Sequence, residues 1–565
     1  MFASQPFKEH GRQPITRLHE EILYMIFLEN STDLDDGFRL IHARSTSQVC
    51  QQWRRLLLNS PSIWARLIDL DDLREARPAW VQEVMTRSQN CPLWITGPVH
   101  VYRPSPFRKN FFLNLISEHW DRIEILHVSD DWDDSSKNLS VDGQDQAGHW
   151  QRLFNRPAPL LKEFAFRYTK RAGLTRRVVQ ALSPSPLLNG NAPALRMFGI
   201  HRNGSASRRP DRFIMDMPSS WLSKLRSFTL QQDLDLTQLL GLLRLTPLLE
   251  KLKVTRFAAS ATDSLQWQES PVSLPRLSSL RLEDWETADV VMFLESISPS
   301  AGCCVDIFKP PKSNNPLPLH QEVITRAQHL FMCYIQEYFE NRPVKNLFLS
   351  YDDQYLEVFE MPSYALRPYS PSFSLSIPNG SEDNSWILQS LFTSRTFANV
   401  MAIDLRDWEK GMPYAPSAFS SAKTIDLRIA DLEPLSKYLE EANDPLLPEL
   451  RSLKLHGLEL GSEYGVALHN ILEQRRQISR QISVLDLSQI GGISCNLDAL
   501  DEFVGLSVVL PLSMSESEEC YVCGTGHPEL LRFGDPRCYE PVQPRLRRIP
   551  RPFARNSTYG WSCHI

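Results

Sequence analysis

The sequence predicts a two-part protein of the α+β or α/β repeat class: an N-terminal three-helix module, then a solenoid in which short strands alternate with helices. Three observations support this prediction. Apolar residues between Leu18 and Leu28 recur at the three- and four-residue spacing of a helix face. A six-residue strand pattern recurs eleven times after residue 120. Many of the intervals between these strands carry helical apolar periodicity.

Length and composition limit the kinds of protein that the chain can be. Its 565 residues are too many for one ordinary core, so we expect several domain-sized units or an extended array. The hydrophobic fraction of 42% and the charged fraction of 23% are typical of a folded protein. A net charge of −6 gives no general attraction to nucleic acid or anionic lipid. Proteins are therefore the expected partners, rather than nucleic acid or membranes.

The distribution of apolar residues and cysteines indicates a cellular location. The N-terminus has no signal-peptide core, and no later run reaches the roughly 18 consecutive apolar residues that span a bilayer. The ten cysteines are irregularly placed, unlike the dense framework of a small secreted domain. We therefore expect a soluble protein with free thiols in the cytoplasm, the nucleus or both.

The N-terminal module begins with the best-defined helix. It is expected from Leu18 to Leu28, with Thr16 able to cap it. After a polar break, NSTDLDDG, a weaker helical pattern covers residues 38–49. A third helix is expected from Cys50 to Leu57, because Asn59, Ser60 and Pro61 end the pattern.

A module of this size leaves apolar surface uncovered. Three helices in about fifty residues bury about 60% or less of what the unfolded chain exposes, so an apolar stripe should remain for a partner. The segments ITRLHEEILYMIF and QVCQQWRRLLLNSPSIW contain an Ile-Leu-x-x-Ile-Phe helix, a Val-Cys-x-x-Trp-Arg segment and a Pro-x-x-Trp close. This order resembles the F-box-like domain of large fungal families. The sequence departs from that pattern at His19, where proline is usual.

The resemblance implies a function and a set of site residues. It implies binding to a Skp1-type adaptor and, through it, to a cullin-based ubiquitin ligase. By position, it assigns the module core and the adaptor-facing surface to Leu18, Glu21, Ile22, Leu23, Ile26, Phe27, Val49, Cys50, Trp53, Pro61 and Trp64. The alternative is that these residues only form the core of a small helical domain.

The likeness continues to about residue 97. The segment AWVQEVMTRSQNCPLWIT predicts an amphipathic helix, a turn at residues 88–90 and a short strand from Leu93 to Ile95. It is similar to the segment that follows the F-box in the same fungal families, where an Arg-Ser turn precedes a Pro-Leu strand.

The long C-terminal region repeats one short strand pattern. In LRSLKL, for example, the last two leucines share one face of a strand at period two. Helical periodicity is clearest at residues 236–245 and 290–297. The strands are expected at residues 123–128, 161–166, 195–200, 225–230, 249–254, 277–282, 344–349, 400–405, 422–427, 450–455 and 482–487.

Most of these strands are about 24 to 38 residues apart. Such a period is typical of a solenoid, in which each unit covers the apolar face of the next. The pattern resembles an irregular leucine-rich-repeat region, without the asparagine that commonly follows the strand. A doubly wound α/β sheet is the alternative, since it also alternates strands and helices. The sequence has no glycine-rich phosphate loop that would favour a nucleotide-binding enzyme.

Polar insertions interrupt the array. Residues 202–216, 306–320 and 355–385 are rich in Pro, Ser or Asn and are expected to be surface loops or partly disordered. The run SDDWDDSSK, residues 129–137, concentrates four aspartates. Because carboxylate spacing alone does not make a calcium cage, a solvated loop is the favoured interpretation.

Two C-terminal features have alternative interpretations. Cys520, Cys523, His527 and Cys538 include a Cys-x-x-Cys pair that could bind structural zinc, with Cys563 and His564 as further candidates. Free thiols in a capping segment are the favoured interpretation, so no cofactor is expected. The tail PRLRRIPRPFAR, residues 544–555, has five arginines. It is expected to be a solvated tail rather than a nuclear-import signal or nucleic-acid contact.

The sequence contains no HExxH, GxSxG or kinase-like motif set, so the chain is not expected to be an enzyme. We expect a substrate receptor of a ubiquitin ligase; the alternative is an interaction scaffold that acts outside a ligase. The predicted organisation is a disordered N-terminus (1–12), the F-box-like domain (13–70), a connecting helix and first strand (71–120), the solenoid (121–515), and a Cys-containing segment with the basic tail (516–565).

Overall fold

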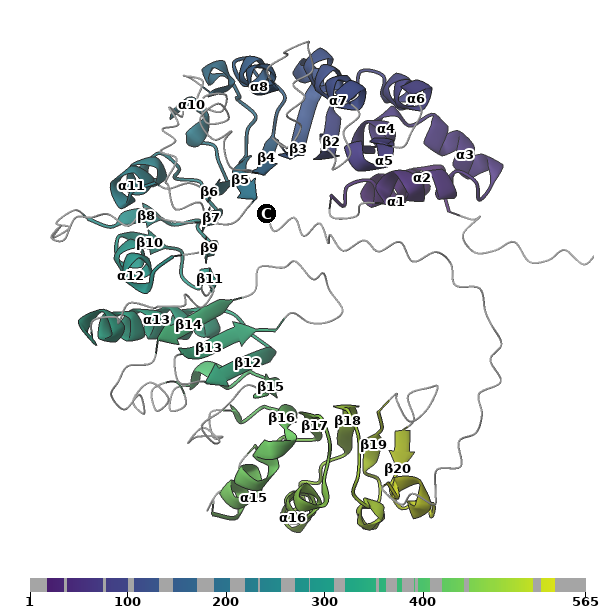
Figure 1. Cartoon of the computed structure of the whole chain (residues 1–565), viewed down its shortest axis with the longest axis vertical. Helices are drawn as coiled ribbons and strands as arrows, with labels where there is room; N and C mark the ends of the chain where they lie inside the picture. The colour runs from purple at the N-terminus through teal and green to yellow at the C-terminus, as the bar shows by residue number, and fades with distance from the viewer. Residues whose placement is uncertain are drawn as a thin grey trace, which may run out of the picture. The chain divides into compact units, whose positions relative to one another are not determined.

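The computed structural model describes most of the chain. The described residues are 18–34, 38–74, 78–99, 106–131, 146–169, 187–203, 219–231, 234–255, 270–283, 285–308, 321–351, 355–361, 373–378, 391, 395–406, 419–441, 447–511 and 520–533. They divide into two compact units. The first holds the residues up to Thr255 together with 272–276, and the second holds 270–271 and the residues from Leu277 on. Figure 1 labels the elements of both units.

The first unit opens with helices and continues as a parallel sheet. Its helices are α1 (Glu20–Asn30), α2 (Arg39–Thr46), α3 (Gln51–Leu58), α4 (Pro61–Arg66), α5 (Leu70–Arg74), α6 (Pro78–Ser88), α7 (Pro106–Glu118), α8 (Gln146–Phe154), α10 (Ser219–Leu222) and α11 (Leu236–Arg244). Its strands are β1 (Ile68–Asp69), β2 (Leu93–Pro98), β3 (Ile123–Asp131), β4 (Glu163–Thr169), β5 (Met197–Asn203), β6 (Ser227–Gln231), β7 (Lys251–Thr255) and β8 (Val272–Leu274).

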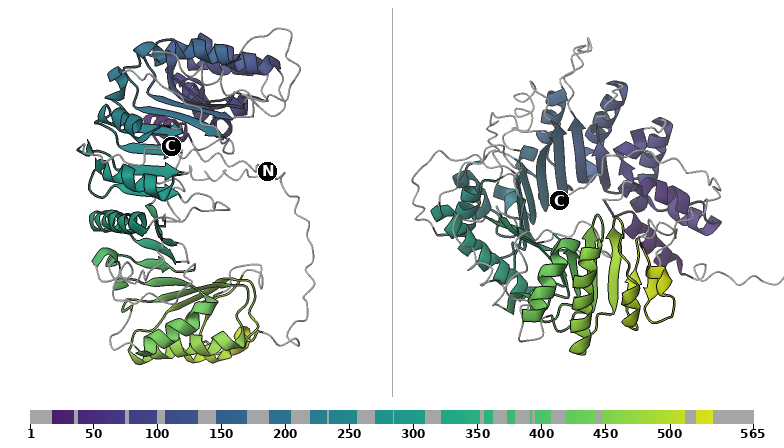
Figure 2. Two further views of the ribbon diagram at one scale, coloured as in Figure 1. Left: turned by 60° about the vertical axis from the view of Figure 1, so that its left-hand side comes forward. Right: turned by 60° about the horizontal axis from the view of Figure 1, so that its bottom comes forward.

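Strands β1 to β7 pair in chain order, each parallel to the next. Helices α7, α8 and α11 lie along one face of these strands (Figures 1 and 2). The core on this face is aromatic: Phe164, Phe198 and Phe228 occupy one row of the sheet register and are fully buried. Trp150 of α8 packs on Phe166 with ring centroids 4.9 Å apart. Large side chains at period two therefore hold the helices to the sheet.

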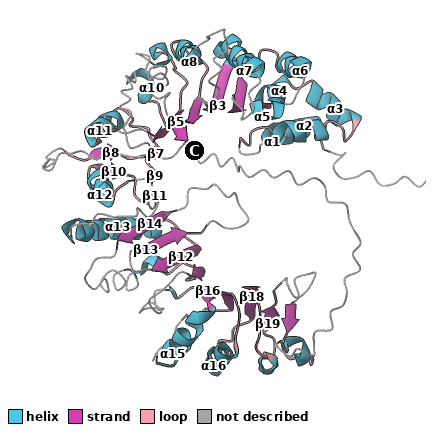
Figure 3. Cartoon of the chain, in the orientation of Figure 1, coloured by secondary structure: helices cyan, strands magenta, loops and turns pink. Residues whose placement is uncertain are grey.

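The second unit combines parallel and antiparallel strands (Figure 3). Its helices are α12 (Thr287–Glu295), α13 (Gln321–Asn341), α15 (Leu432–Glu441) and α16 (Ser462–Gln477). Its strands are β9 (Ser279–Glu283), β10 (Ile297–Pro299), β11 (Cys304–Phe308), β12 (Asn346–Tyr351), β13 (Tyr355–Glu360), β14 (Ser374–Pro378), β15 (Ala402–Asp404), β16 (Thr424–Arg428), β17 (Ser452–Gly457), β18 (Val484–Ile490), β19 (Ser507–Val509) and β20 (Cys520–Val522).

The strand order of the second unit contradicts the predicted fold class. Strands β9 and β11 to β20 belong to a mostly parallel mixed sheet, and their order in it departs from their order along the chain. Strand β11 pairs with β9 and β14, β13 is antiparallel to both β12 and β14, and β12 continues to β15. In a solenoid each unit contacts only its neighbours in sequence, whereas here β14 lies between β11 and β13. The structure is therefore a large mixed sheet with helices, and the solenoid prediction is wrong.

The prediction of a separate three-helix module is also wrong. A fourth helix, α4, follows directly after the third and begins with Pro61 at its first turn, where the missing N–H costs nothing. Helix α4 packs on α6 and β2. The N-terminal helices are thus joined to the parallel sheet of the first unit rather than forming an independent bundle.

One buried ion pair anchors α2 to the strands. The Arg39 side chain is 1% exposed and donates hydrogen bonds to the Arg66 carbonyl oxygen at 2.9 Å and to Thr96 Oγ1 at 2.6 Å. Its Nη2 lies 3.9 Å from Asp69 Oδ2, which also accepts a hydrogen bond from Thr96 Oγ1 at 3.0 Å. Burial raises the pKa of Asp69, while its backbone hydrogen bonds and Arg39 oppose that rise.

Most of the local predictions are confirmed. Each of the eleven predicted strand segments contains a strand, and the helices expected at 236–245 and 290–297 are α11 and α12. The predicted loop at 355–385 is wrong, because β13 and β14 lie within it. The insertions at 202–216 and 306–320 begin with the ends of β5 and β11, and 204–216 and 309–320 lie outside the described residues.

The acidic run at 129–137 begins inside a strand. Ser129, Asp130 and Asp131 belong to β3, so the loop prediction is wrong for these residues, and 132–137 lie outside the described residues. Asp130 is fully buried and accepts a hydrogen bond from Trp150 Nε1 at 2.8 Å. No helix in the described part of the chain combines the length and apolar character needed to span a membrane.

Candidate functional site

Helix α1 positions the first part of the candidate site. It begins at Glu20. The preceding residue, His19, has an extended backbone, and its Nδ1 caps the helix by accepting a hydrogen bond from the Glu21 N–H at 3.4 Å. The helix starts two residues after the predicted Leu18, and His19, which replaces the usual proline, caps it. Thr16, the predicted cap, lies outside the described residues.

The inner side of α1 packs against α3 and α4. Leu23 and Phe27 are 1% and 5% exposed. The Phe27 ring meets the Trp53 ring edge-on, with centroids 5.1 Å apart. Trp64 of α4 is buried and donates its indole N–H to the Leu57 carbonyl at 2.8 Å. The Phe27–Trp53 contact holds α1 against α3, and the Trp64 hydrogen bond holds α4 against α3.

The outer side of α1 exposes apolar side chains that lie close together on the helix. Ile22, Met25 and Ile26, at spacings of three and four residues, are 46%, 63% and 42% exposed. Phe38 and Ile41 at α2, and Val49 before α3, are exposed as well. We call these six side chains the apolar helical surface.

This concentration distinguishes the apolar helical surface from ordinary scattered residues. Among the described residues, fourteen large apolar side chains are exposed, and six of them lie between Ile22 and Val49. Single exposed apolar residues are normal, whereas adjacent ones, such as Ile22, Met25 and Ile26 on consecutive turns of α1, mark an interaction surface. An exposed ion pair, Arg55 Nη2 to Glu20 Oε1 at 2.9 Å, joins α3 to α1 beside this surface. Such charged pairs are typical of the polar rim of an interface.

The structure divides the sequence-predicted site residues into three groups. Leu23, Phe27 and Trp64 belong to the core. Leu18, Trp53 and Pro61 are half-buried. Glu21, Ile22, Ile26, Val49 and Cys50 are exposed.

Sequence reasoning missed Met25, Phe38 and Ile41. Met25 precedes Ile26 and lies three residues after Ile22, so helical spacing could have identified it. Phe38 and Ile41 have the same three-residue spacing, but few other residues of α2 are apolar.

The candidate zinc ligands are only partly described. Cys520 and His527 are exposed, Cys523 is buried, and Cys538, Cys563 and His564 lie outside the described residues. Burial raises the pKa of Cys523 to about 11. Within the described ranges, no group of three or more His, Cys, Asp or Glu side chains is arranged to hold a metal ion. The basic tail, residues 544–555, also lies outside the described residues.

Comparison with known proteins adds no assignment. No family model matches this chain, and no curated protein matches it. The arguments for a function therefore come from the residues and geometry of the apolar helical surface.

Proposed function

We propose that this chain is a non-catalytic substrate-recognition subunit of a Skp1-cullin-F-box type ubiquitin ligase. In this proposal the F-box-like segment, with its apolar helical surface, binds a Skp1-type adaptor. The observation that carries the proposal is the position of Ile22 and Ile26, which are exposed although their neighbours Leu23 and Phe27 form the local core.

The energetics of burial favour a protein partner for this surface. Covering an isoleucine that is already half-buried contributes about 1 kcal/mol, since full burial of such a side chain contributes roughly 1.5 to 3 kcal/mol. Two isoleucines and a methionine on one helix face fit the groove-binding mode, in which residues three and four apart serve as anchors. A few central apolar anchors surrounded by a polar rim are sufficient for a specific interface.

The sheet regions are the proposed site of substrate recruitment. In β16, β17 and β18, alternate residues are buried on the side of α15 and α16, and the other face presents partly exposed polar side chains that include Asp426, Lys454 and Asp486. A face of mixed charge suits recognition of a protein surface. The chain would then act in the cytoplasm or nucleus by raising the local concentration of a substrate near the ligase.

A pull-down with purified adaptor tests the proposal. We expect the full chain to retain a Skp1-type adaptor and the double variant Ile22→Asp with Ile26→Asp to lose it, because a charge buried in an apolar interface is strongly unfavourable. Val466→Asp is the matched control, since Val466 is also exposed on a helix, α16.

Two results would reject the proposal. One is undiminished retention of the adaptor by the double variant, and the other is no retention by the parent chain. Either result would favour the alternative, an interaction scaffold that acts outside a ubiquitin ligase. Circular dichroism of all three proteins verifies that the substitutions leave the helices intact.

A further inference from the structure

A row of basic side chains follows one edge of the sheet in the second unit. Lys345, Lys423 and Arg451 stand directly before β12, β16 and β17, respectively. In the sequence they occupy the same place, which is the second position of VKNLFL, AKTIDL and LRSLKL. We call these three side chains the basic edge.

Backbone hydrogen bonds align the basic edge. The Met401 N–H donates to the Lys345 carbonyl oxygen at 2.8 Å. The Lys423 N–H donates to the Met401 carbonyl oxygen at 2.7 Å, and the Arg451 N–H donates to the Lys423 carbonyl oxygen at 2.9 Å. The parallel ladder therefore continues one residue beyond the strand starts, across β12, β15, β16 and β17. Because neighbouring strands are about 4.8 Å apart, the row is about 14 Å long.

The side chains of the basic edge are open to a partner. All three are exposed. Within the described part of the chain, none of the three makes a hydrogen bond or an ion pair through its side chain. Like charges that lie this close repel one another unless salt or a partner of opposite charge offsets them.

Further positive charge lies at the Arg451 end of the row. The buried Arg475 donates a hydrogen bond from Nη2 to the carbonyl oxygen of Leu450, at 3.2 Å. Burial, followed by repulsion from Arg480 and Arg451, lowers the pKa of Arg475 to about 10. Arg480 Nη1 lies 3.7 Å from Glu449 Oε1. Three arginines therefore lie near one another at this end, and Glu449 is the carboxylate paired with one of them.

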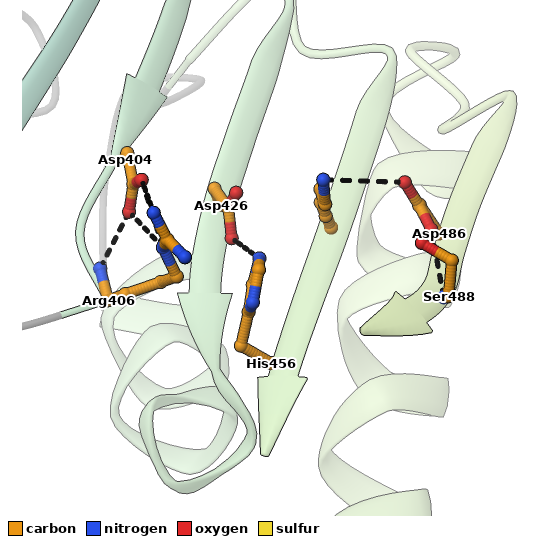
Figure 4. A network of polar contacts seen from close by, with 7 residues as sticks. Asp404, Arg406, Asp426, His456, Asp486 and Ser488 are labelled. Atoms are coloured by element: carbon orange, nitrogen blue, oxygen red, sulfur yellow. Dashed lines mark hydrogen bonds and ion pairs between the residues drawn. The ribbon is translucent and has the colours of Figure 1, made fainter. Parts of the chain in front are cut away.

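Other charged side chains of the same strands have partners. Figure 4 shows Arg406 against Asp404 and His456 beside Asp426, with helices behind the strands. Arg406 Nη2 donates to Asp404 Oδ2 at 2.6 Å. These strands thus match charges across the sheet face, whereas the described residues supply no counter-ion to the basic edge.

The corresponding row of the first unit balances its charges. Backbone hydrogen bonds align five residues before its strands in the same way, namely Glu124, Lys162, Arg196, Arg226 and Glu250. Lys162 pairs with Glu124, and Arg226 Nη1 lies 3.3 Å from Glu250 Oε1. An acidic residue therefore neutralises a cation at each end of that row, whereas no residue in the row of the basic edge is acidic.

We propose that the basic edge binds an acidic segment of a partner protein. Complementary charge guides such a segment to the three cations and sets its position along them. An extended chain rises about 3.3 Å per residue, so about five residues, most of them Asp or Glu, are enough to cover the row. The proposal is independent of adaptor binding, because the basic edge and the apolar helical surface belong to different units.

A nucleic acid fits this edge less well than an acidic peptide does. Single-stranded nucleic acids bind surfaces that combine cations with aromatic side chains, on which the bases stack. The row contains no aromatic residue, since its fourth member is Met401. The net charge of −6 on the whole chain also repels a long polyanion. A short acidic segment meets mainly the local positive charge.

Fluorescence anisotropy with a labelled hexaglutamate peptide and the full chain tests the proposal. We expect the parent to bind the peptide at low salt and to release it at about 0.5 M salt, which screens exposed charges. The triple variant Lys345→Gln, Lys423→Gln and Arg451→Gln should bind the peptide at least about tenfold more weakly, because it can no longer form three exposed ion pairs.

The matched control removes the same amount of charge from the corresponding row of the first unit. It carries Lys162→Gln, Arg196→Gln and Arg226→Gln, and it should bind the peptide within about twofold of the parent. Because all six substituted side chains are exposed, both variants should fold, and circular dichroism verifies this.

The parent chain alone supplies a decisive first result. A parent that does not bind hexaglutamate at low salt would overturn the proposal. So would a triple variant that binds as tightly as the matched control. Tighter binding of a labelled oligothymidylate of equal charge than of hexaglutamate would also overturn it, since the edge would then select nucleic acid.

Discussion

Helices α1 and α11 belong to the same compact unit and are both rich in apolar residues, but they use those residues differently. Helix α11 buries Leu236, Leu239, Leu240 and Leu243, all on one face. Helix α1 fully buries only Leu23 and Phe27, and Ile22, Met25 and Ile26 belong to the apolar helical surface. A helix that is apolar on two sides needs two surfaces to cover it. The difference shows that the fold covers the apolar face of α11 and leaves apolar side chains on one side of α1 exposed.

The starts of the two helices also differ, because α11 is capped more firmly than α1. Asp235 and Gln238 form a reciprocal capping box at the start of α11, with the Gln238 N–H 2.8 Å from Asp235 Oδ1. Helix α1 has only the long hydrogen bond to His19. Local signals therefore stabilise α11 strongly, whereas the position of α1 depends on its packing against α3 and α4.

The largest loss of stability is expected at Arg39, which anchors the N-terminal helices to the strands. We expect Arg39→Met to lower the free energy of unfolding by about 4 kcal/mol at pH 7, since removal of one partner leaves a buried charge uncompensated. Without Arg39 the pKa of Asp69 rises further, so the loss should be smaller at pH 5, where the carboxyl is more protonated. Urea unfolding at both pH values measures the difference.

The control for the anchor is Arg55→Met, because the Arg55–Glu20 pair is solvent-exposed. It should change the free energy of unfolding by less than about 1 kcal/mol. Equal losses in the two variants would mean that the N-terminal helices are not held to the strands through Arg39.

The next largest effect should come from the buried face of α11. Leu239 is fully buried, and we expect Leu239→Ala to cost about 3 kcal/mol through lost burial and the cavity that remains. Thermal and urea unfolding measure this loss. A cost below about 1 kcal/mol would show that α11 is packed no more tightly than the open side of α1.

A smaller effect is expected at the two helix starts. Asp235→Ala should lower the free energy of unfolding by about 1 kcal/mol, since it leaves the Gln238 N–H without its side-chain acceptor. His19→Ala should lower the free energy of unfolding by only a few tenths of a kcal/mol, because the hydrogen bond that it removes is long and exposed. The comparison would fail if the histidine variant lost more stability than the aspartate variant.

The smallest effect should come from the apolar helical surface itself. Ile26→Gln keeps helix propensity and side-chain length, so we expect the free energy of unfolding to change by no more than about 0.5 kcal/mol. Urea unfolding of the full chain measures the change. A loss of more than about 2 kcal/mol would mean that other parts of the chain already cover Ile26.

Much of the local structure was predictable because its signals are short-range. Period-two apolar residues in segments such as 422–427 and 450–455 identify β16 and β17, and three-to-four spacing identifies α1 and α11. The strand order could not be predicted in the same way. The β13–β14 hairpin lies in a segment rich in Ser and Pro, and only its pairing with β11 and β12 shows that it interrupts the order of a solenoid.

Only part of the candidate site was predictable in its residues, and their exposure was not. The spacing of Leu23 and Phe27 does not distinguish them from Ile22 and Ile26 as core residues, because all four belong to one continuous apolar arc of about 140° around α1. Which side chains are buried depends on where α3 and α4 pack. The burial of Arg39 depends likewise on Asp69 and Thr96, whose contact with α2 no local pattern indicates.

Calorimetric titration of a purified Skp1-type adaptor into the full chain tests the central claim most directly. Our account predicts saturable binding by the parent, weakened by about 100-fold or more in Ile22→Asp with Ile26→Asp. The matched Val466→Asp chain should bind within about twofold of the parent, because a surface substitution away from the interface has little effect. Equal affinities for the parent and the double variant, or no heat of binding with the parent, would contradict the account.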